Sequence, residues 1–302
     1  MPGECAHLWW RVDYFLPACT MFSTTHKRSA HHVPTGYTRS RNTLLMKVLQ
    51  LPVLGDNYSY LLHDPDSQDT AVIDPGDADA VAETLRQRQW RLTHIFNTHH
   101  HSDHTAGNLS LREAFGCDIY AASSEAGRIP GVTRTLVDGQ SVSIGSLQIQ
   151  AMEVPGHTLG HLAYYMRTRI APLLFCGDTL FSLGCGRLFE GDARTMWHSL
   201  SKLCRLPDES LVYCAHEYTM GNAAFALQID PGNKALEAYS HRIRQLRECG
   251  IPSIHSMLGD EKACTPFLRA DQPAIKAAVD MTDDAEAWEV FARLRQLKDS
   301  FR

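Results

Sequence analysis

A cluster of imidazole and carboxylate side chains lies in the run Asn97-Thr98-His99-His100-His101-Ser102-Asp103-His104. Such a cluster is costly to pack as plain structure, because every buried polar side chain needs a partner. Imidazole and carboxylate groups are ligands that suit a borderline-soft divalent ion such as zinc. A cluster of surface histidines is the alternative, but the pattern favours a metal site.

Three later residues carry the same ligand types, and each occupies a loop directly after a predicted strand. His157 lies between two predicted strands, Asp178 follows the strand 173–176, and His216 follows the strand 210–214. Loops that leave a sheet at its edge are where α/β folds place their chemistry. A lone histidine is more often structural, but the ordered series predicts that these side chains converge at one edge of the fold.

The spacing within the first cluster predicts which side chains share a direction. An extended backbone points alternate residues to opposite sides, so His99 and His101 face one way and His100 the other. Asp103 and His104, on the turn into the next helix, can face a second ion. We expect His100, and His161 further along the chain, to support ligands or the fold and not to bind metal.

The elements that must position these residues alternate between strands and helices, which indicates a layered α/β architecture. Strands are predicted at 46–53, 57–63, 70–74, 92–97, 118–121, 147–154, 161–167, 173–176 and 210–214, and helices at 77–88, 105–115 and 193–203. After His216 helices dominate, at 223–227, 233–249 and 284–298, the last with a capping-box-like start at Asp283-Asp284-Ala285-Glu286. We therefore predict a metal-binding domain over 46–215 and a helical domain over 216–302.

The first 45 residues differ from the rest and are excluded from the predicted fold. They hold five basic and two acidic residues, a net charge of +3, and no acidic residue occurs between Thr20 and Leu45. They lack the pattern of a secretory signal. An organellar transit peptide and an extension upstream of a true start at Met46 are both consistent with them.

Composition and charge exclude several classes of function. The 302 residues carry a net charge of −5, and residues 46–302 carry −8, which disfavours nucleic-acid and anionic-membrane binding. No apolar stretch is long enough to span a membrane. The nine cysteines include no C-x-x-C pair and are expected to be free thiols in a reducing compartment, so we expect a cytoplasmic protein.

Longer motifs resemble one known family. The order of the candidate ligands along the chain resembles the order found in the metallo-β-lactamase superfamily. Within it, Gly177-Asp178-Thr179-Leu180-Phe181, Gly184-Cys185-Gly186-Arg187-Leu188-Phe189-Glu190-Gly191 and Cys214-Ala215-His216-Glu217-Tyr218-Thr219 resemble glyoxalase II, the hydroxyacylglutathione hydrolase family. Pro266-Phe267-Leu268-Arg269 and Lys298-Asp299-Ser300-Phe301 fit it as well. The resemblance runs from Met46 to the C-terminus and implies a four-layer αββα metallo domain followed by a helical C-terminal domain.

The resemblance also implies a site with two divalent ions. It assigns His99, His101 and His157 to one ion, Asp103, His104 and His216 to the other, and Asp178 as a bridge between them. Water held between two such ions loses its proton near neutral pH and attacks the substrate, so Asp103 and Asp178 are catalytic through the hydroxide that they help to hold. Zinc is the expected metal, with iron or manganese as alternatives, because His/Asp sites accept all three.

The implied reaction is hydrolysis of an S-(2-hydroxyacyl)glutathione, such as S-D-lactoylglutathione, in the second step of methylglyoxal detoxification. The family's substrate contacts match Arg187, Phe189, Tyr218, Arg295 and Lys298. Cationic side chains suit the two carboxylates of glutathione. For Arg295 and Lys298, a solvated helix end is the alternative. Phe189 stands where some members carry tyrosine, so it contributes only backbone or packing.

One competing function shares the first motif: a persulfide dioxygenase-like oxidoreductase with a single iron. It needs neither the complete second set of ligands nor the helical glutathione-binding tail, and both patterns are present here. β-Lactam hydrolysis is disfavoured by the C-terminal extension. We expect the chain to act as a monomer on a glutathione thioester.

Overall fold

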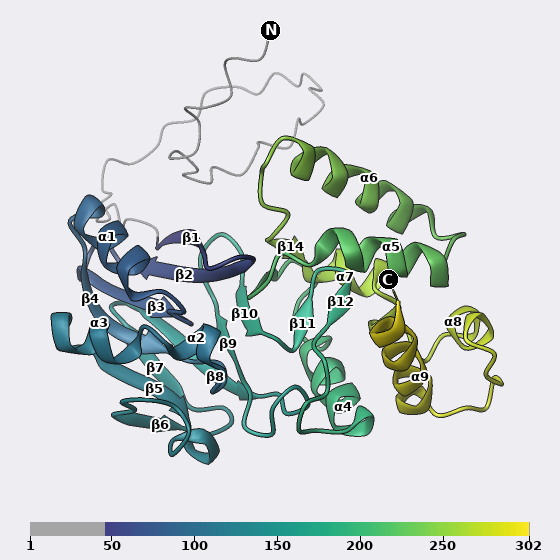
Figure 1. The fold of residues 1–302 in the computed structure, drawn as a ribbon, viewed down its shortest axis with the longest axis horizontal. Helices are drawn as coiled ribbons and strands as arrows, with labels where there is room; N and C mark the ends of the chain where they lie inside the picture. Colours follow the sequence, from purple (N-terminus) through teal and green to yellow (C-terminus); the bar gives the residue numbers. More distant parts are fainter. Residues whose placement is uncertain (1–45, 302) are drawn as a thin grey trace, which may run out of the picture.

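The computed structural model describes residues 46–301, which form two facing six-stranded sheets with helices around them (Figure 1). The first sheet has its strands in chain order: β1 (Lys47–Val53), β2 (Asn57–His63), β3 (Asp69–Ile73), β4 (Arg91–Phe96), β5 (Asp118–Ala122) and β6 (Arg134–Leu136). Strands β1 to β3 pair antiparallel, and β3 to β6 pair parallel. The parallel half brings the carboxyl ends of its strands to one edge.

The second sheet has the order β14-β13-β10-β9-β8-β7. Its strands are β7 (Ser141–Ile144), β8 (Leu147–Glu153), β9 (Leu162–Met166), β10 (Leu173–Gly177), β13 (Leu211–Cys214) and β14 (Ser256–Met257). All its pairs are antiparallel except β10 with β13. A short hairpin of β11 (Leu180–Phe181) and β12 (Gly184–Cys185) follows β10. The ends of β10 and β13 therefore lie side by side.

Strand β2 shows how the layers are built, because it is buried on both faces. Leu61 packs outward in a cluster with helices α1 (Ala78–Arg88) and α3 (Asn108–Phe115). Tyr60 and Leu62 point the other way and pack in the central cluster with the second sheet. Helix α4 (Ala193–Leu203) supplies Leu200 and Leu203 to that same cluster. The order helix, sheet, sheet, helix confirms the predicted four-layer architecture.

Helices dominate the chain after residue 218 and gather at the end of the molecule opposite α1 and α3 (Figure 1). They are α5 (Thr219–Ile229), α6 (Lys234–Glu248), α7 (Leu258–Cys264), α8 (Pro273–Ala278) and α9 (Ala287–Ser300), with a 3₁₀ turn over Pro266–Leu268. This confirms the predicted helical C-terminal region. Phe225, Phe267 and Phe291 belong to the same apolar cluster as α4, so the core runs across residue 215. The domain division at that residue stays a prediction.

Three predicted helices differ from those in the structure. The helix predicted at 223–227 is the longer α5, which begins at Thr219. The helix predicted at 105–115 is two helices, α2 (Ser102–Thr105) and α3, because Gly107 donates its N–H to the Pro75 carbonyl at 2.8 Å and leaves the helical ladder. The last helix begins at Ala287, not at residue 284. Its N-cap is Glu286, which forms a capping box with Glu289.

Two further predictions concern the membrane and the N-terminus. Between residues 46 and 301, no helix combines the length and the apolar character that a membrane span requires. The interpretation of residues 1–45 as a transit-like or upstream extension lies outside the described residues.

Candidate metal centre and substrate pocket

Three imidazoles from two loops converge on one point. His99 and His101 follow β4, and His157 lies in the loop between β8 and β9. His101 Nδ1 lies 2.9 Å from His99 Nε2 and 3.1 Å from His157 Nε2. The predicted alternation therefore holds, since His99 and His101 face the same point. These three nitrogens can bind one metal ion together.

A second group stands beside the first. Asp103 and His104 belong to the one-turn helix α2, and His216 follows β13. Asp103 Oδ2 lies 3.4 Å from His104 Nε2 and 3.5 Å from His216 Nε2. These three groups can hold another metal ion. Asn57 donates a hydrogen bond to the same Asp103 oxygen at 2.9 Å and so fixes that carboxylate.

Asp178 lies between the two groups and faces both. Its Oδ2 is 3.4 Å from His157 Nε2, whereas its Oδ1 is 3.6 Å from His104 Nε2 and 3.4 Å from His216 Nε2. Each oxygen of one carboxylate is thus directed at a different ligand group. The backbone at residue 186 packs directly against the backbone of Asp178. This is possible because residue 186 is glycine: a Cβ there would lie 1.9 Å from the Asp178 carbonyl oxygen.

The outward-facing ring nitrogens also have partners, which fixes the orientation of the rings. His104 Nδ1 contacts Asp74 Oδ2 at 3.0 Å, and His216 Nδ1 contacts Asp56 Oδ1 at 2.9 Å. His157 Nδ1 contacts the carbonyl of Arg187 at 2.8 Å. Sequence reasoning missed Asp56 and Asp74. The available signal was their position at the ends of structural elements, Asp56 in the turn between β1 and β2 and Asp74 directly after β3.

The charge distribution fits bound cations. Burial and the neighbouring imidazoles hold the pKa of His99 well below its usual value, and burial lowers the pKa of His157, so this group presents neutral, metal-binding rings. At the second group, burial lowers the pKa of His104, but Asp74 and Asp178 outweigh it and raise that pKa well above normal. For Asp178, burial is outweighed by the imidazoles around it, which hold its pKa well below normal. The carboxylates around this second group therefore favour a positive charge beside them.

Two buried polar atoms give an independent test of the fit. His104 Nε2 and Asp178 Oδ1 are buried and make no hydrogen bond to any residue between 46 and 301. Both atoms point at the space between the ligand groups, where a cation would satisfy them. Together with the donor set of five imidazoles and two carboxylates, this fits a divalent metal ion.

The other conspicuous histidines lie next to the site without joining it. His161 contacts the backbone N–H of Asp178 at 3.2 Å and the Thr179 hydroxyl at 3.2 Å, so it positions the Asp178 loop. His100 points away from the ligand groups and contacts Arg128 at 2.6 Å. Both were predicted to be supporting residues.

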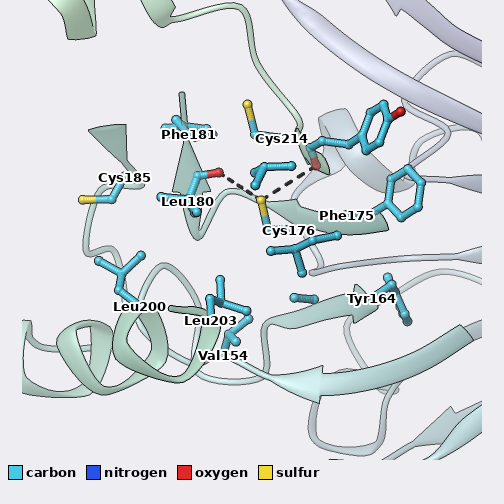
Figure 2. Packing of buried hydrophobic residues seen from close by; sticks show 14 of the residues in the cluster. Val154, Tyr164, Phe175, Cys176, Leu180, Phe181, Cys185, Leu200, Leu203 and Cys214 are labelled. Carbon is cyan, nitrogen blue, oxygen red and sulfur yellow. Dashed lines mark hydrogen bonds between the residues drawn. The ribbon is translucent and has the colours of Figure 1, made fainter. Parts of the chain in front are cut away.

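The nearby cysteines are packed as apolar residues. Figure 2 shows Cys176 among aliphatic and aromatic side chains, with its Sγ 3.0 Å from the Leu180 carbonyl oxygen. Burial raises the pKa of Cys176 well above normal, and it raises the pKa of Cys185 to about 11. A thiol held protonated is neither a nucleophile nor a metal ligand.

A cavity of about 560 Å³ opens beside the ligand groups. His157 and Asp178 line it on one side, and all five predicted substrate contacts line it as well: Arg187, Phe189, Tyr218, Arg295 and Lys298. Tyr218 stacks on the His216 ring, with the centroids 4.7 Å apart and the planes 3° apart. Phe189 packs edge-on against His157 at 5.1 Å and is exposed over most of its surface.

The two cations from α9 differ in exposure. Arg295 is buried: it donates to the Cys185 carbonyl at 2.9 Å and to Asp299 Oδ1 at 2.9 and 3.1 Å. The alternative of a solvated helix end therefore does not describe Arg295. Lys298 is half-buried and donates to the Gly221 carbonyl at 3.0 Å. Its ammonium lies 5.6 and 5.2 Å from the ring centres of Phe225 and Phe301.

The fold and the metal centre define a class. Residues 53–216 match the family described as the metallo-beta-lactamase superfamily, and residues 217–301 match the family described as hydroxyacylglutathione hydrolase C-terminus. The chain belongs to the metallo-β-lactamase superfamily and, within it, to the hydroxyacylglutathione hydrolase (glyoxalase II) family.

Curated relatives carry the narrower assignment. A hydroxyacylglutathione hydrolase of Methylococcus capsulatus is 50% identical over 85% of this chain and all of its own length. One of Maricaulis maris is 47% identical over 84% of this chain and 98% of its own. These names favour the thioester hydrolase over the single-iron oxidoreductase that shares the first motif.

Solved structures at lower identity share the fold. ETHE1 from Myxococcus xanthus aligns with a TM-score of 0.59 and 23% identity, covering 85% of this chain and 96% of its own. TTHA1623, solved in a di-iron-bound form, aligns with a TM-score of 0.53 and 23% identity, covering 72% and 99%. At this identity the likeness concerns the architecture alone.

Proposed function

We propose that this protein hydrolyses S-(2-hydroxyacyl)glutathione thioesters, such as S-D-lactoylglutathione, to glutathione and a 2-hydroxy acid. The observation that carries the proposal is the position of Asp178, which faces both ligand groups and also lines a cavity whose walls bear Arg187 and Lys298. A dicarboxylate substrate fits that cavity because its charges meet cations while its thioester lies beside the metal centre. In the cell this reaction would complete the removal of methylglyoxal.

Two divalent ions, most simply zinc, are proposed for the centre. His99, His101 and His157 would hold one, Asp103, His104 and His216 would hold the other, and Asp178 would contribute one oxygen to each. Such ions lower the pKa of a water to near neutrality and polarise the carbonyl of the thioester. The di-iron form of TTHA1623 supports a centre with two ions on this fold.

The side chains of the site then have separate roles. Asp178 and Asp103 would hold the metal ions in place. Asn57 fixes the orientation of Asp103 through its amide. Burial and nearby carboxylates raise the pKa of Tyr218 to about 12, so its hydroxyl stays protonated and can donate a hydrogen bond to substrate. The leaving thiolate needs little help, because the pKa of a free thiol is about 8.5.

Glutathione carboxylates are proposed to bind at the α9 end of the cavity. Arg187 is largely exposed there, with its Nε 3.9 Å from Asp299 Oδ1. Asp299 also occupies two donors of Arg295. A substrate carboxylate could take the place of Asp299 and pair with these cations, with Lys298 beside them. Phe189 would contribute only its ring, as packing next to His157.

We also propose that the protein works as a monomer in the cytoplasm. The seven cysteines within the described residues are free, which suits a reducing compartment. Size-exclusion chromatography with light scattering tests the first statement, and cell fractionation tests the second.

The test of the function is direct. The purified protein, loaded with zinc, should consume lactoylglutathione and release free thiol, and it should stop doing so when a chelator removes the metal. Failure of the metal-loaded protein to release thiol, together with oxygen consumption on glutathione persulfide by an iron-loaded sample, would favour the oxidoreductase alternative.

A further inference from the structure

A second charged cluster lies just outside the metal centre. Its members are His100, Glu125, Arg128 and Glu190, none of which is a proposed metal or substrate ligand. His100 Nδ1 lies 3.1 Å from Glu125 Oε2, and neither atom hydrogen-bonds to another described group. Arg128 Nη2 lies 2.6 Å from His100 Nε2 and 2.6 Å from Glu190 Oε1. Glu125 is only 2% exposed.

This cluster also hydrogen-bonds to the loop that carries His157. Glu125 Oε1 accepts a hydrogen bond from the Gly160 N–H at 3.2 Å, and Glu190 Oε2 accepts one from the Leu159 N–H at 3.0 Å. The backbone N–H of Glu190 in turn donates to the His157 carbonyl at 3.3 Å. Residue 160 packs so closely that a Cβ there would lie 2.3 Å from Glu125 Cγ, so glycine is required.

The donor set alone could suggest a third metal site, since the imidazole and the two carboxylates lie close enough to hold an ion. Arg128 argues against that, because its guanidinium already supplies the positive charge between His100 and Glu190. The two buried atoms without a hydrogen-bond partner among the described residues, His100 Nδ1 and Glu125 Oε2, face each other at 3.1 Å, so we treat the cluster as a polar network centred on Arg128.

We propose that Glu125, Arg128 and Glu190 are positioning residues that hold the His99–His101 loop and the His157 loop in register. His100 lies between His99 and His101 in the chain. Contacts that fix the position of its ring therefore also limit the movement of both of these ligands. The second loop is held through Leu159 and Gly160, two and three residues beyond His157. The network thus joins the two loops that together supply the three-histidine group. As a statement about the reaction, this inference rests on the proposed function.

The physical reason lies in the geometry of metal binding. Three histidines from two loops bind tightly only if the loops keep their separation, and partners outside the ligand shell typically contribute 10–100-fold in metal affinity or activity. The buried Glu125 carboxylate should hold its partners firmly, because leaving a buried polar group without a hydrogen bond costs more free energy than leaving an exposed group without one. The proposed substrate contacts line the cavity, and none of the four residues of the cluster is among the described residues that line it, so the network should affect kcat and not KM.

The experiment uses Glu125→Gln, which keeps an acceptor for the Gly160 N–H but removes the charge facing His100. We expect metal release to a chromogenic chelator to become about tenfold faster, and kcat to fall about tenfold with KM unchanged. The absorption spectrum of the cobalt-substituted protein should change as well, which a merely structural role would not produce. Arg128→Ala should change all three readouts in the same direction, by less, because Arg128 is half exposed.

Controls make the outcome decisive. The pair Arg86–Glu83 has the same 2.6 Å separation but lies on α1, so Arg86→Ala should leave release, spectrum and kcat unchanged. Arg128→Ala combined with Glu190→Gln should cost less than the sum of the single changes, because the two residues form one ion pair. Release rate, spectrum and kcat at wild-type values in Glu125→Gln would overturn the inference.

Two other outcomes, an unfolded variant and an inactive wild-type protein, still leave the positioning role testable. If Glu125→Gln does not fold, Arg128→Ala at the half-exposed end of the network decides the question. If the wild-type protein hydrolyses no glutathione thioester, the proposed function fails, and the metal-release rates of the same variants still test the positioning role.

Discussion

Replacing Lys298 by methionine separates substrate binding from chemistry. Lys298 lines the cavity, and its ammonium lies 5.6 and 5.2 Å from the ring centres of Phe225 and Phe301. Methionine keeps an unbranched apolar side chain there and removes the ammonium, together with its hydrogen bond to the Gly221 carbonyl. A glutathione carboxylate is remote from the thioester carbon, so it binds Lys298 equally in the ground and transition states. The expected effect is a higher KM with kcat nearly unchanged.

The size of the effect follows from the exposure of the group. Lys298 is half-buried and already donates to the Gly221 carbonyl, so only part of its hydrogen-bonding capacity reaches the substrate. Exposed ion pairs contribute about 0.2–1 kcal/mol, and a half-buried one belongs at the upper end of that range. About 1 kcal/mol corresponds to a roughly fivefold rise in KM. The rise should shrink at high salt, because counterions screen the pair.

The assay compares two substrates at two ionic strengths. KM and kcat are measured for lactoylglutathione and for a simple thioester without the glutathione carboxylates. Only the glutathione substrate should show the increase. An unchanged KM for lactoylglutathione, or an equal loss with both thioesters, would refute the proposed contact.

Three further predictions use other parts of the molecule. Arg295→Met should lower the free energy of unfolding by about 1–3 kcal/mol in a denaturant titration, because it leaves the buried Cys185 carbonyl without its donor; unchanged stability would contradict this. Asp56→Ala should reduce metal affinity or kcat by about 10–100-fold, because the His216 ring loses its outer partner, and wild-type metal content with full turnover would show that this partner is dispensable. Deleting residues 1–45 should leave melting temperature and specific activity unchanged, since no proposed ligand lies there; an insoluble or inactive product would make the segment part of the fold.

Sequence patterns predicted the longer strands and helices and missed the shortest elements. Strands such as β2 and β10 are short, fully buried segments rich in apolar and aromatic residues, which composition and the flanking turn residues identify. The two-residue strands β11, β12 and β14 are too short to show any period and exist through tertiary pairing. The break between α2 and α3 has the same cause, because the contact of Gly107 with Pro75 is not visible in local sequence.

The candidate metal ligands were identifiable because seven residues of the right types follow strands in a fixed order. Their outer partners were not, since a single carboxylate such as Asp74 has no distinguishing pattern until the fold brings it to His104. The burial of Arg295 was also unpredictable, because helical spacing gives a face but not what covers it. Local pattern thus predicts ligand chemistry, whereas orientation depends on contacts distant in sequence.

The proposed bridge at Asp178 is tested most directly by metal content and turnover measured on the same samples. The wild-type protein should bind two divalent ions per chain and hydrolyse lactoylglutathione. Asp178→Ala should lose this stoichiometry and nearly all turnover, because both ligand groups lose the carboxylate that faces them. Asp178→Asn should be impaired as well, since a neutral amide is a poorer anionic ligand. An Asp178→Ala protein that retains two ions and more than a tenth of the wild-type kcat would contradict the account.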